Sequence, residues 1–217
     1  MTSYHPDLNI LTEYAAGSLE LPLAISVSTH LHFCTECRHS VQKMEQLGGA
    51  MIETLAPQSL SEQSFEKLMS AIESNASSCK SEGKPDAHSN KPHVINQLLK
   101  GQTPKWRKVT SALQTATLNA GQQDCEVSLQ KIKAGGKVPK HDHRGLEVTV
   151  VIEGSFSDEA GIYRPGDFLI KQPGDVHQPT SARNQDCLCL SIQQAPVKLT
   201  GFLGAFINPF LKLQTAY

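Results

Sequence analysis

Two clusters of metal-ligating side chains, about a hundred residues apart, lie in segments with different hydrophobic periodicity. Residues 30–37 read HLHFCTEC and offer imidazole and thiolate, which are ligands that suit zinc. Residues 141–147 read HDHRGLE and offer imidazole and carboxylate, which suit zinc or a redox metal. A chain that builds both sites is constrained to two regions of different architecture, and the two chemistries indicate two roles.

The region before residue 75 has the periodicity of α-helices. Apolar side chains recur at spacings of three and four residues, and runs of β-branched residues are few. Breaks are expected at Gly17, near Phe33–Cys34 and at residues 57–59, which read PQS. Ser61 supplies a capping hydroxyl for the helix that follows. The pattern predicts four helices between Asp7 and Ser74.

The region after residue 93 has the pattern of short β-strands. Residues 75–92, which precede it, are polar, small and without period, as is typical of a flexible linker. From about residue 94, short apolar segments alternate with Gly and Pro. Many short strands at close spacing predict a small antiparallel β-barrel or sandwich. The strands expected are 111–118, 125–132, 146–153, 166–171 and 187–192.

The N-terminal cluster has the spacing of a zinc site. His30, Cys34 and Cys37 are separated by four and seven residues, so on a helix they share one face and converge on one ion. A tetrahedral site needs a fourth ligand, and His5, just before the first expected helix, is the well-placed remote candidate. A Cys-x-x-Cys pair is also a redox motif, but such motifs lie in a βαβ setting, which is missing here. The spacing therefore favours zinc.

The second cluster predicts a metal site inside a β-structure. His141, His143 and Glu147 have the same parity, so on an extended strand they point to the same side. His177 follows a Pro-Gly turn at residues 173–174 and reaches the cluster from a neighbouring strand. Three imidazoles and one carboxylate close a tetrahedral zinc site or leave open positions on an octahedral metal. The metal is zinc or another divalent ion.

Two further cysteines lie on one face of the last expected strand. Cys187 and Cys189 are two residues apart, a span of about 6.6 Å, near the upper limit of the Cα separation in a disulfide. A direct bridge would therefore demand strain or local unfolding. Burial in the core explains both thiols, and oxidation or recruitment as metal ligands is the alternative that the sequence leaves open.

Charge is distributed unevenly along the chain. Residues 1–76 hold three Lys or Arg against nine Asp or Glu, whereas the whole chain has a formal net charge of -1. An acidic N-terminal region does not suit direct binding to nucleic acid. It suits a basic protein partner, although a solvated helical surface explains the same charges.

No segment approaches the run of about 18 apolar residues that spans a membrane, and the N-terminus lacks the pattern of a signal peptide. We therefore expect a cytoplasmic protein with no membrane partner. In that reducing compartment, six cysteines argue against a disulfide framework and for metal ligation, redox sensing or burial.

His5 followed by His30-x-x-x-Cys34-x-x-Cys37, within a four-helix segment, resembles the zinc-binding anti-sigma domain of bacterial regulators. The resemblance covers roughly residues 1–76. It implies a domain that wraps an extracytoplasmic-function (ECF) sigma factor and blocks the access of that factor to RNA polymerase.

Residues 135–154 match the first motif of the cupin superfamily at every spaced position, Gly-x5-His-x-His-x3-Glu-x6-Gly. The second motif, from Gly166 to Ser181, is looser, because Pro173 stands one place late and Ser181 stands where the family usually has asparagine. His177 keeps its place, so no ligand position is affected.

A zinc-binding anti-sigma segment joined by a linker to a cupin resembles the ChrR-type anti-sigma factors over nearly the whole chain. The resemblance implies a transcriptional inhibitor, not an enzyme, in which the cupin metal site senses a signal such as singlet oxygen or an organic peroxide. The implied architecture is a helical zinc domain at residues 1–76, a linker at 77–93, a cupin barrel at 94–200 and an apolar tail at 201–217 that packs onto one of the domains.

Two other functions are compatible with the residues. A metal-dependent cupin enzyme, such as a dioxygenase, would use the helical zinc domain only for oligomerisation. It would also need an acid, base or substrate anchor, and no such group is evident besides the metal ligands. A metal-binding or storage module without a protein partner is the third possibility.

Overall fold

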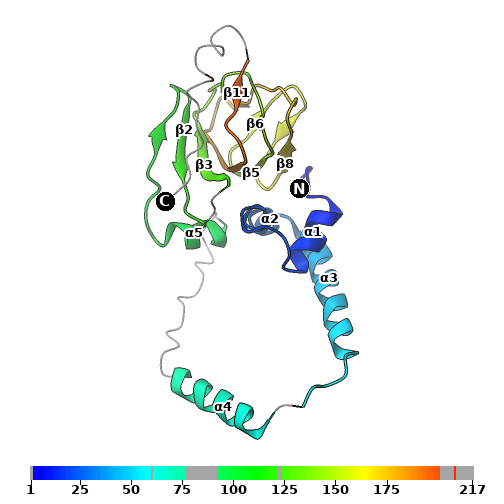
Figure 1. Ribbon diagram of the computed structural model, residues 1–217. Helices are drawn as coiled ribbons and strands as arrows, with labels where there is room; N and C mark the ends of the chain where they lie inside the picture. Colours follow the sequence, from blue (N-terminus) through cyan, green and yellow to red (C-terminus); the bar gives the residue numbers. More distant parts are fainter. Residues whose placement is uncertain (1, 60, 77–91, 122–123, 201–207, 209–217) are drawn as a thin grey trace. The chain divides into compact units, whose positions relative to one another are not determined.

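The computed structural model describes residues 2–59, 61–76, 92–121, 124–200 and 208 (Figure 1). The chain divides into two compact units. Residues 1–45 and 91–217 form the first, and residues 46–90 form the second, so the boundary falls within a helix. The predicted linker at 77–93 and the tail at 201–217 lie almost entirely outside the described residues, and the domain boundaries stay predictions.

The four helices expected before residue 77 are present. The first begins after Asp7, whose carboxylate accepts a hydrogen bond from the Ile10 backbone N–H at 2.9 Å. The second ends at Phe33, because Cys34 has an extended backbone. The Ser61 hydroxyl accepts from the Ser64 N–H, as predicted for the cap of the fourth. The helices are α1 (Leu8–Ala15), α2 (Leu21–Phe33), α3 (Thr35–Glu53) and α4 (Glu62–Ala76).

A fifth helix, α5 (His93–Leu99), precedes the first expected strand, and the sequence pattern did not indicate it. Two short helical turns with apolar residues give too little periodicity to be recognised in the sequence. Ile95 is buried against α2 and the sheet, and Lys100 ends the helix in the left-handed conformation. Tertiary packing therefore stabilises this short helix.

The C-terminal region is an antiparallel cupin-like β domain. Its large sheet has six strands in the order β1-β2-β3-β10-β5-β8, and it includes all five strands that the sequence predicted. The bounds in this sheet are β1 (Arg107–Lys108), β2 (Leu113–Thr117), β3 (Glu126–Ile132), β10 (Cys187–Gln193), β5 (Glu147–Glu153) and β8 (Phe168–Lys171).

Two small sheets complete the β domain. One has the order β7-β6-β9 and the other pairs β11 with β4. Every one of these strands is two residues long, which is too short for the sequence pattern to reveal. They are β7 (Ile162–Tyr163), β6 (Phe156–Ser157), β9 (Thr180–Ser181), β11 (Lys198–Leu199) and β4 (His141–Asp142).

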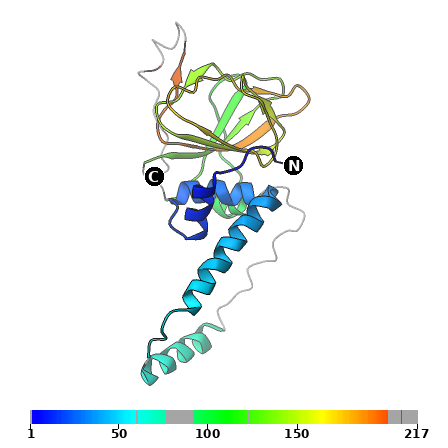
Figure 2. The same cartoon turned by 90° about the vertical axis from the view of Figure 1, so that its right-hand side faces the viewer.

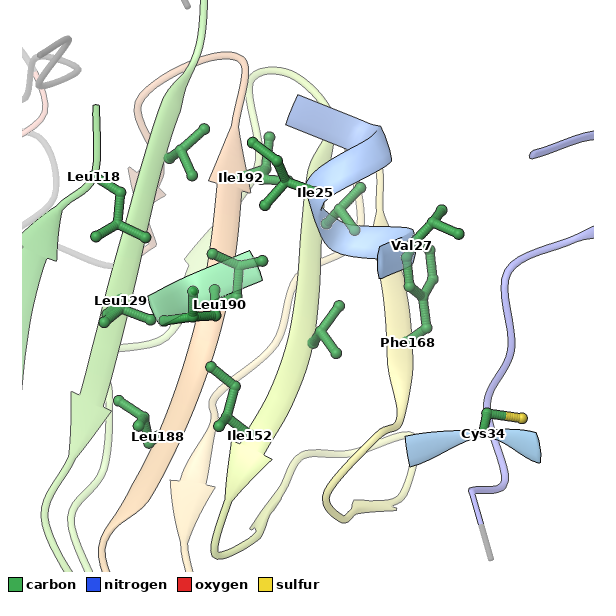
Figure 3. Close-up of a cluster of buried hydrophobic side chains, with 14 of the residues drawn as sticks. Ile25, Val27, Cys34, Leu118, Leu129, Ile152, Phe168, Leu188, Leu190 and Ile192 are labelled. Atoms are coloured by element: carbon green, nitrogen blue, oxygen red, sulfur yellow. The ribbon is translucent and has the colours of Figure 1, made fainter. Parts of the chain in front are cut away.

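Both faces of the large sheet are buried. Val148 and Val150 point to the face that α2 and α5 cover, and Val151 belongs to a second apolar cluster on the other face. Figure 3 shows Ile25 and Val27 of α2 beside the strands of this sheet. The first helices and the β domain therefore share one hydrophobic core, and Figure 2 shows α1 and α2 against one side of the strands.

None of the described helices is both long enough and apolar enough to cross a membrane.

Candidate metal sites

The second predicted cluster is assembled at the junction of the sheets. His141 lies on β4, His143 follows it, Glu147 begins β5, and His177 precedes β9. All four side chains are buried, and their ligand atoms lie within 4.8 Å of one another. A pair of backbone hydrogen bonds joins His141 to His177, with lengths of 3.0 and 3.1 Å. On one extended strand His141, His143 and Glu147 would point to the same side, whereas β4 ends at Asp142 and β5 begins only at Glu147.

The imidazole rings present their lone pairs to a common point. The Nδ1 atom of His141 lies 2.8 Å from the Pro139 carbonyl oxygen, which can only accept, so this nitrogen donates. The Nδ1 atom of His177 lies 3.0 Å from the Asp158 carboxylate and donates in the same way. Both Nε2 atoms therefore carry lone pairs, and they face each other at 3.1 Å. Such a contact is repulsive unless a cation lies between them, so the site fits a metal ion.

Glu147 is prepared to act as an anionic ligand. Ser191 Oγ donates to its Oε1 atom at 3.0 Å. Its Oε2 atom lies 3.0 Å from His143 Nδ1 but makes no hydrogen bond of good geometry with any described residue. Burial alone would favour the neutral acid. The two neighbouring imidazoles and the Ser191 hydroxyl outweigh it and lower the pKa of Glu147 to about 2.

Asp158, which no sequence pattern indicated as a site residue, holds His177 through the hydrogen bond to its Nδ1 atom. This fully buried carboxylate accepts from Tyr163 OH at 2.8 Å and lies 3.4 Å from Lys171 Nζ. Burial opposes its ionisation, but the His177 contact, a backbone N–H, Tyr163 and Lys171 lower the pKa of Asp158 to about 2. The turn signal Asp-Glu-Ala-Gly at 158–161 was visible in the sequence, but nothing there related it to His177.

A cavity of about 360 Å³ opens beside this cluster. Glu147, His141 and His177 line it together with apolar side chains such as Leu113 and Phe156. The cavity gives a small molecule access to the cluster.

The N-terminal cluster is also brought together. His5 Nδ1 lies 3.4 Å from the sulfur atoms of both Cys34 and Cys37, and the ring of His30 packs edge-on against that of His5. The ligand atoms of the four residues lie within 4.8 Å of one another. His5 is exposed, whereas the other three are buried. The structure thus brings all eight predicted residues into two clusters of four.

The N-terminal cluster contains buried ligand atoms that a bound cation would stabilise. His30 Nε2 is buried without a hydrogen-bond partner among the described residues. Burial and the neighbouring Cys34 raise the pKa of Cys37 to about 12, so this thiol stays protonated without a cation. Burial likewise lowers the pKa of His30, which keeps the ring neutral. A neutral imidazole and thiols that ionise on metal binding fit zinc.

Both histidines of the N-terminal cluster are attached to the β domain. His30 Nδ1 donates to the Gly166 carbonyl oxygen at 2.5 Å. The segment before His5 pairs with the start of β8, because Phe168 N–H donates to Tyr4 O at 3.0 Å and Asp167 accepts from the Ser3 N–H at 2.7 Å. No sequence signal indicated these contacts, which join residues more than 130 positions apart.

The two late cysteines are packed as thiols in the second apolar cluster. Cys187 and Cys189 are buried, with their sulfur atoms 3.6 Å apart. The mutual contact and burial raise the pKa of Cys189, which keeps it protonated. Cys189 also lines the cavity beside the second cluster. The predicted core role fits these positions.

A cupin-like domain has a three-histidine, one-carboxylate cluster, and the helical region before it has a two-histidine, two-cysteine cluster, which together define a class of proteins with two candidate metal sites. The family of ChrR cupin-like domains matches residues 96–197. The anti-sigma-E factor ChrR of Cereibacter sphaeroides is 31% identical over 210 residues, which cover 97% of this chain and 98% of that protein. The chain therefore belongs to the ChrR family of anti-sigma factors, which are regulators and not enzymes.

A solved structure is similar over most of the molecule. The crystal structure of Rhodobacter sphaeroides SigE in complex with the anti-sigma ChrR aligns with a TM-score of 0.76 and 31% sequence identity. The alignment covers 89% of this chain and 100% of that one.

Proposed function

We propose that this protein binds an ECF-type sigma factor, keeps it from RNA polymerase and releases it when the cupin-like site senses a signal. Its family membership and its likeness to the ChrR of the SigE complex support the partner class. Zinc occupies the N-terminal cluster of His5, His30, Cys34 and Cys37. Zinc or another divalent ion occupies the second cluster, His141, His143, Glu147 and His177, which we call the cupin-like cluster. The protein acts in the cytoplasm, where sigma factors meet RNA polymerase.

The observation that carries the proposal is the exposed apolar face of α4. Phe65, Leu68, Met69 and Ile72 recur at the spacing of one helix face, and each is at least 40% exposed. The end of α3 and the following turn expose four further apolar residues, which are Leu47, Met51, Ile52 and Leu55. Amphipathic helices of this kind bury such faces in a partner. Only three of the twelve charged Asp, Glu, Lys and Arg residues in 1–76 are basic, which suits a basic partner surface.

The zinc cluster supplies the rigidity that this surface needs. It joins α2, α3 and the N-terminal segment at one point, and α3 leads directly into the apolar surface. Metal binding contributes folding free energy on the order of 10 kcal/mol in small zinc domains. Loss of zinc therefore weakens sigma-factor binding.

The signal is oxidative. The cavity admits a small molecule such as an organic peroxide to the imidazoles, and Cys189 lies on its wall. The contact with Cys187 and burial raise the pKa of Cys189, and thiols without thiolate character resist oxidation, so the metal cluster is the group that senses the oxidant. The closed barrel of a cupin would shield the cluster from larger molecules.

Co-expression with the ECF sigma factors of the same genome tests the proposal. The tagged full-length chain is expected to retain one of them through affinity purification and gel filtration, and to block its transcription with core RNA polymerase. Leu68→Glu is expected to abolish retention, because it places a charge in the apolar face. Ser70→Glu adds the same charge on the polar face of α4 and leaves retention intact. Retention of no ECF sigma factor, or equal retention by both variants, would refute the proposal.

A further inference from the structure

The cupin-like cluster and the N-terminal cluster are joined by a continuous series of side-chain contacts. The series begins at His177, whose Nδ1 donates to Asp158 at 3.0 Å. Asp158 is buried and fixed by further bonds from the Ala160 N–H and from Tyr163 OH, at 2.9 and 2.8 Å. A change in the position of His177 therefore displaces the Asp158 carboxylate, which is buried and cannot move into solvent.

The next contacts lead from Asp158 to Tyr4. The ring of Tyr163 packs edge-on against the ring of Tyr4, with centroids 4.9 Å apart. The turn that Asp158 closes touches the same side chain, since a Cβ atom added to Gly161 would lie 2.6 Å from the Tyr4 hydroxyl oxygen. Tyr4 thus rests both on Tyr163 and on the Asp158 turn.

Tyr4 is the residue before His5, and the backbone around it is fixed. Asp167 Oδ1 accepts from the N–H groups of Ser3 and Tyr4, at 2.7 and 3.3 Å, and Phe168 N–H donates to Tyr4 O. His5 is the exposed member of the N-terminal cluster, and it lies before α1, whereas the other three members lie on α2, on α3 or between them. Its place in the cluster depends on how the Ser3–His5 segment is held against the β domain.

We propose that Asp158, Tyr163 and Tyr4 connect the two clusters, so that the state of the cupin-like cluster sets how firmly His5 holds its metal ion. The inference rests on the proposed function because it gives the signal a route to the sigma-binding helices. Asp158 and Tyr163 are positioning residues, since they act on metal ligands without touching the metal of the N-terminal cluster. Release of the sigma factor begins with loosening of His5.

Cobalt tests the connection in the full-length chain without a sigma factor. Co²⁺ bound by thiolates has a sulfur-to-metal charge-transfer absorption, and of the two clusters only the N-terminal one contains thiols. The rate at which this absorption disappears after addition of excess EDTA therefore reports metal release from that cluster. His177→Ala is expected to speed the release by about fivefold, the lower end of the range for coupled sites.

A double-mutant cycle identifies the route. Tyr163→Phe removes the hydroxyl that donates to Asp158 but keeps the ring against Tyr4. In this background, His177→Ala is expected to change the release rate by less than about twofold. Tyr14→Phe is the matched control, because it removes a hydroxyl that is hydrogen-bonded to Ser28 at 2.9 Å on α1 and α2, outside the series. The fivefold effect is expected to persist in the control.

Asp158→Asn is a second variant that leaves all eight cluster residues in place. It is expected to speed cobalt release as His177→Ala does, and the two changes together are expected to add nothing further. The connection would be overturned if His177→Ala left the cobalt release rate unchanged. It would also be overturned if His177→Ala changed that rate by the same factor in the Tyr163→Phe background as in the unmodified chain. The sigma factor plays no part in this assay, so failure of the connection is distinct from failure of the proposed function.

Discussion

The two clusters differ in how the fold supports them. The cupin-like cluster is buried, and each of its four residues comes from the β domain, with Pro139, Asp158 and Ser191 fixing three of them. The N-terminal cluster takes Cys34 from the junction of α2 and α3 and Cys37 from α3, whereas its histidines are held by the β domain, and His5 is exposed. The first is a preorganised site, whereas the second depends on several elements remaining docked. At the N-terminal cluster, loss of one contact therefore leads most readily to movement of the elements that supply the ligands.

The largest effect is expected from removing a thiol of the N-terminal cluster. Cys37→Ser removes a proposed zinc ligand on α3 beside His5, so the full-length chain is expected to lose zinc from this cluster. Its affinity for the sigma factor is expected to fall about a hundredfold, the upper range for losses at metal sites. Metal analysis and equilibrium binding measure the two effects. Cys125→Ser, a buried thiol outside both clusters, is the control. An unchanged sigma complex in Cys37→Ser would contradict a structural role for the zinc.

The docking of the N-terminal segment is tested at Gly166. This glycine has φ +92°, and a Cβ atom there would lie 2.4 Å from Thr2 Cγ2 and 2.5 Å from Phe33 Cβ. Gly166→Ala is expected to lower the free energy of unfolding by about 2–4 kcal/mol, because backbone strain and a steric clash add together. Urea denaturation measures the loss. Gly174→Ala has φ +100° and open space around it, so strain alone is expected to cost about 1 kcal/mol. Equal losses in the two variants would exclude close packing at Gly166.

The preorganised cluster is expected to give the metal-free protein a pH-dependent stability. Burial lowers the pKa of His141 and of His177 from the ordinary value of 6.5. Unfolded chains therefore take up protons below pH 6.5 that the folded protein binds only at lower pH, and stability falls with decreasing pH. The slope approaches about 1.4 kcal/mol per pH unit for each imidazole. Denaturation of EDTA-treated protein between pH 7.5 and about 5 measures it. A His141→Gln variant with an unchanged slope would show that this imidazole does not contribute.

The smallest effect on the sigma complex is expected from the cupin-like ligands. His141→Ala or Glu147→Ala leaves the helices intact, so the affinity for the sigma factor is expected to change less than about twofold, as for distant independent sites. Release under singlet oxygen or organic peroxide is expected to be blunted. Fluorescence anisotropy of labelled sigma factor, with and without oxidant, separates the two effects. Normal release by both variants would mean that the cupin-like cluster is not the sensor.

Much of the architecture was predictable because it depends on local pattern. Helix periodicity and capping residues such as Ser61 located α1 to α4, and apolar runs located the five strands of the large sheet. The two-residue strands and α5 were not predictable, because tertiary packing forms them and they leave no periodic signal.

Only those parts of the two candidate metal sites were predictable in which ligand-type residues stand at characteristic spacings along the sequence. His5 had no spacing to support it and entered the prediction as the remaining well-placed donor. The supporting contacts of Asp158, Gly166 and Asp167 join segments far apart in sequence, and a buried carboxylate looks the same in sequence as a solvated one. The shared core between α2 and the sheet was also hidden, because an apolar helix face does not specify its partner.

Native mass spectrometry of the protein co-purified with its sigma factor is the most direct test of zinc-dependent sigma-factor binding, because one spectrum reports both protein stoichiometry and metal content. We expect a one-to-one complex with zinc in the N-terminal cluster, which persists in His141→Ala and is lost together with that zinc in Cys37→Ser. A complex that survives in Cys37→Ser without zinc, or one that disappears in His141→Ala, would contradict this expectation.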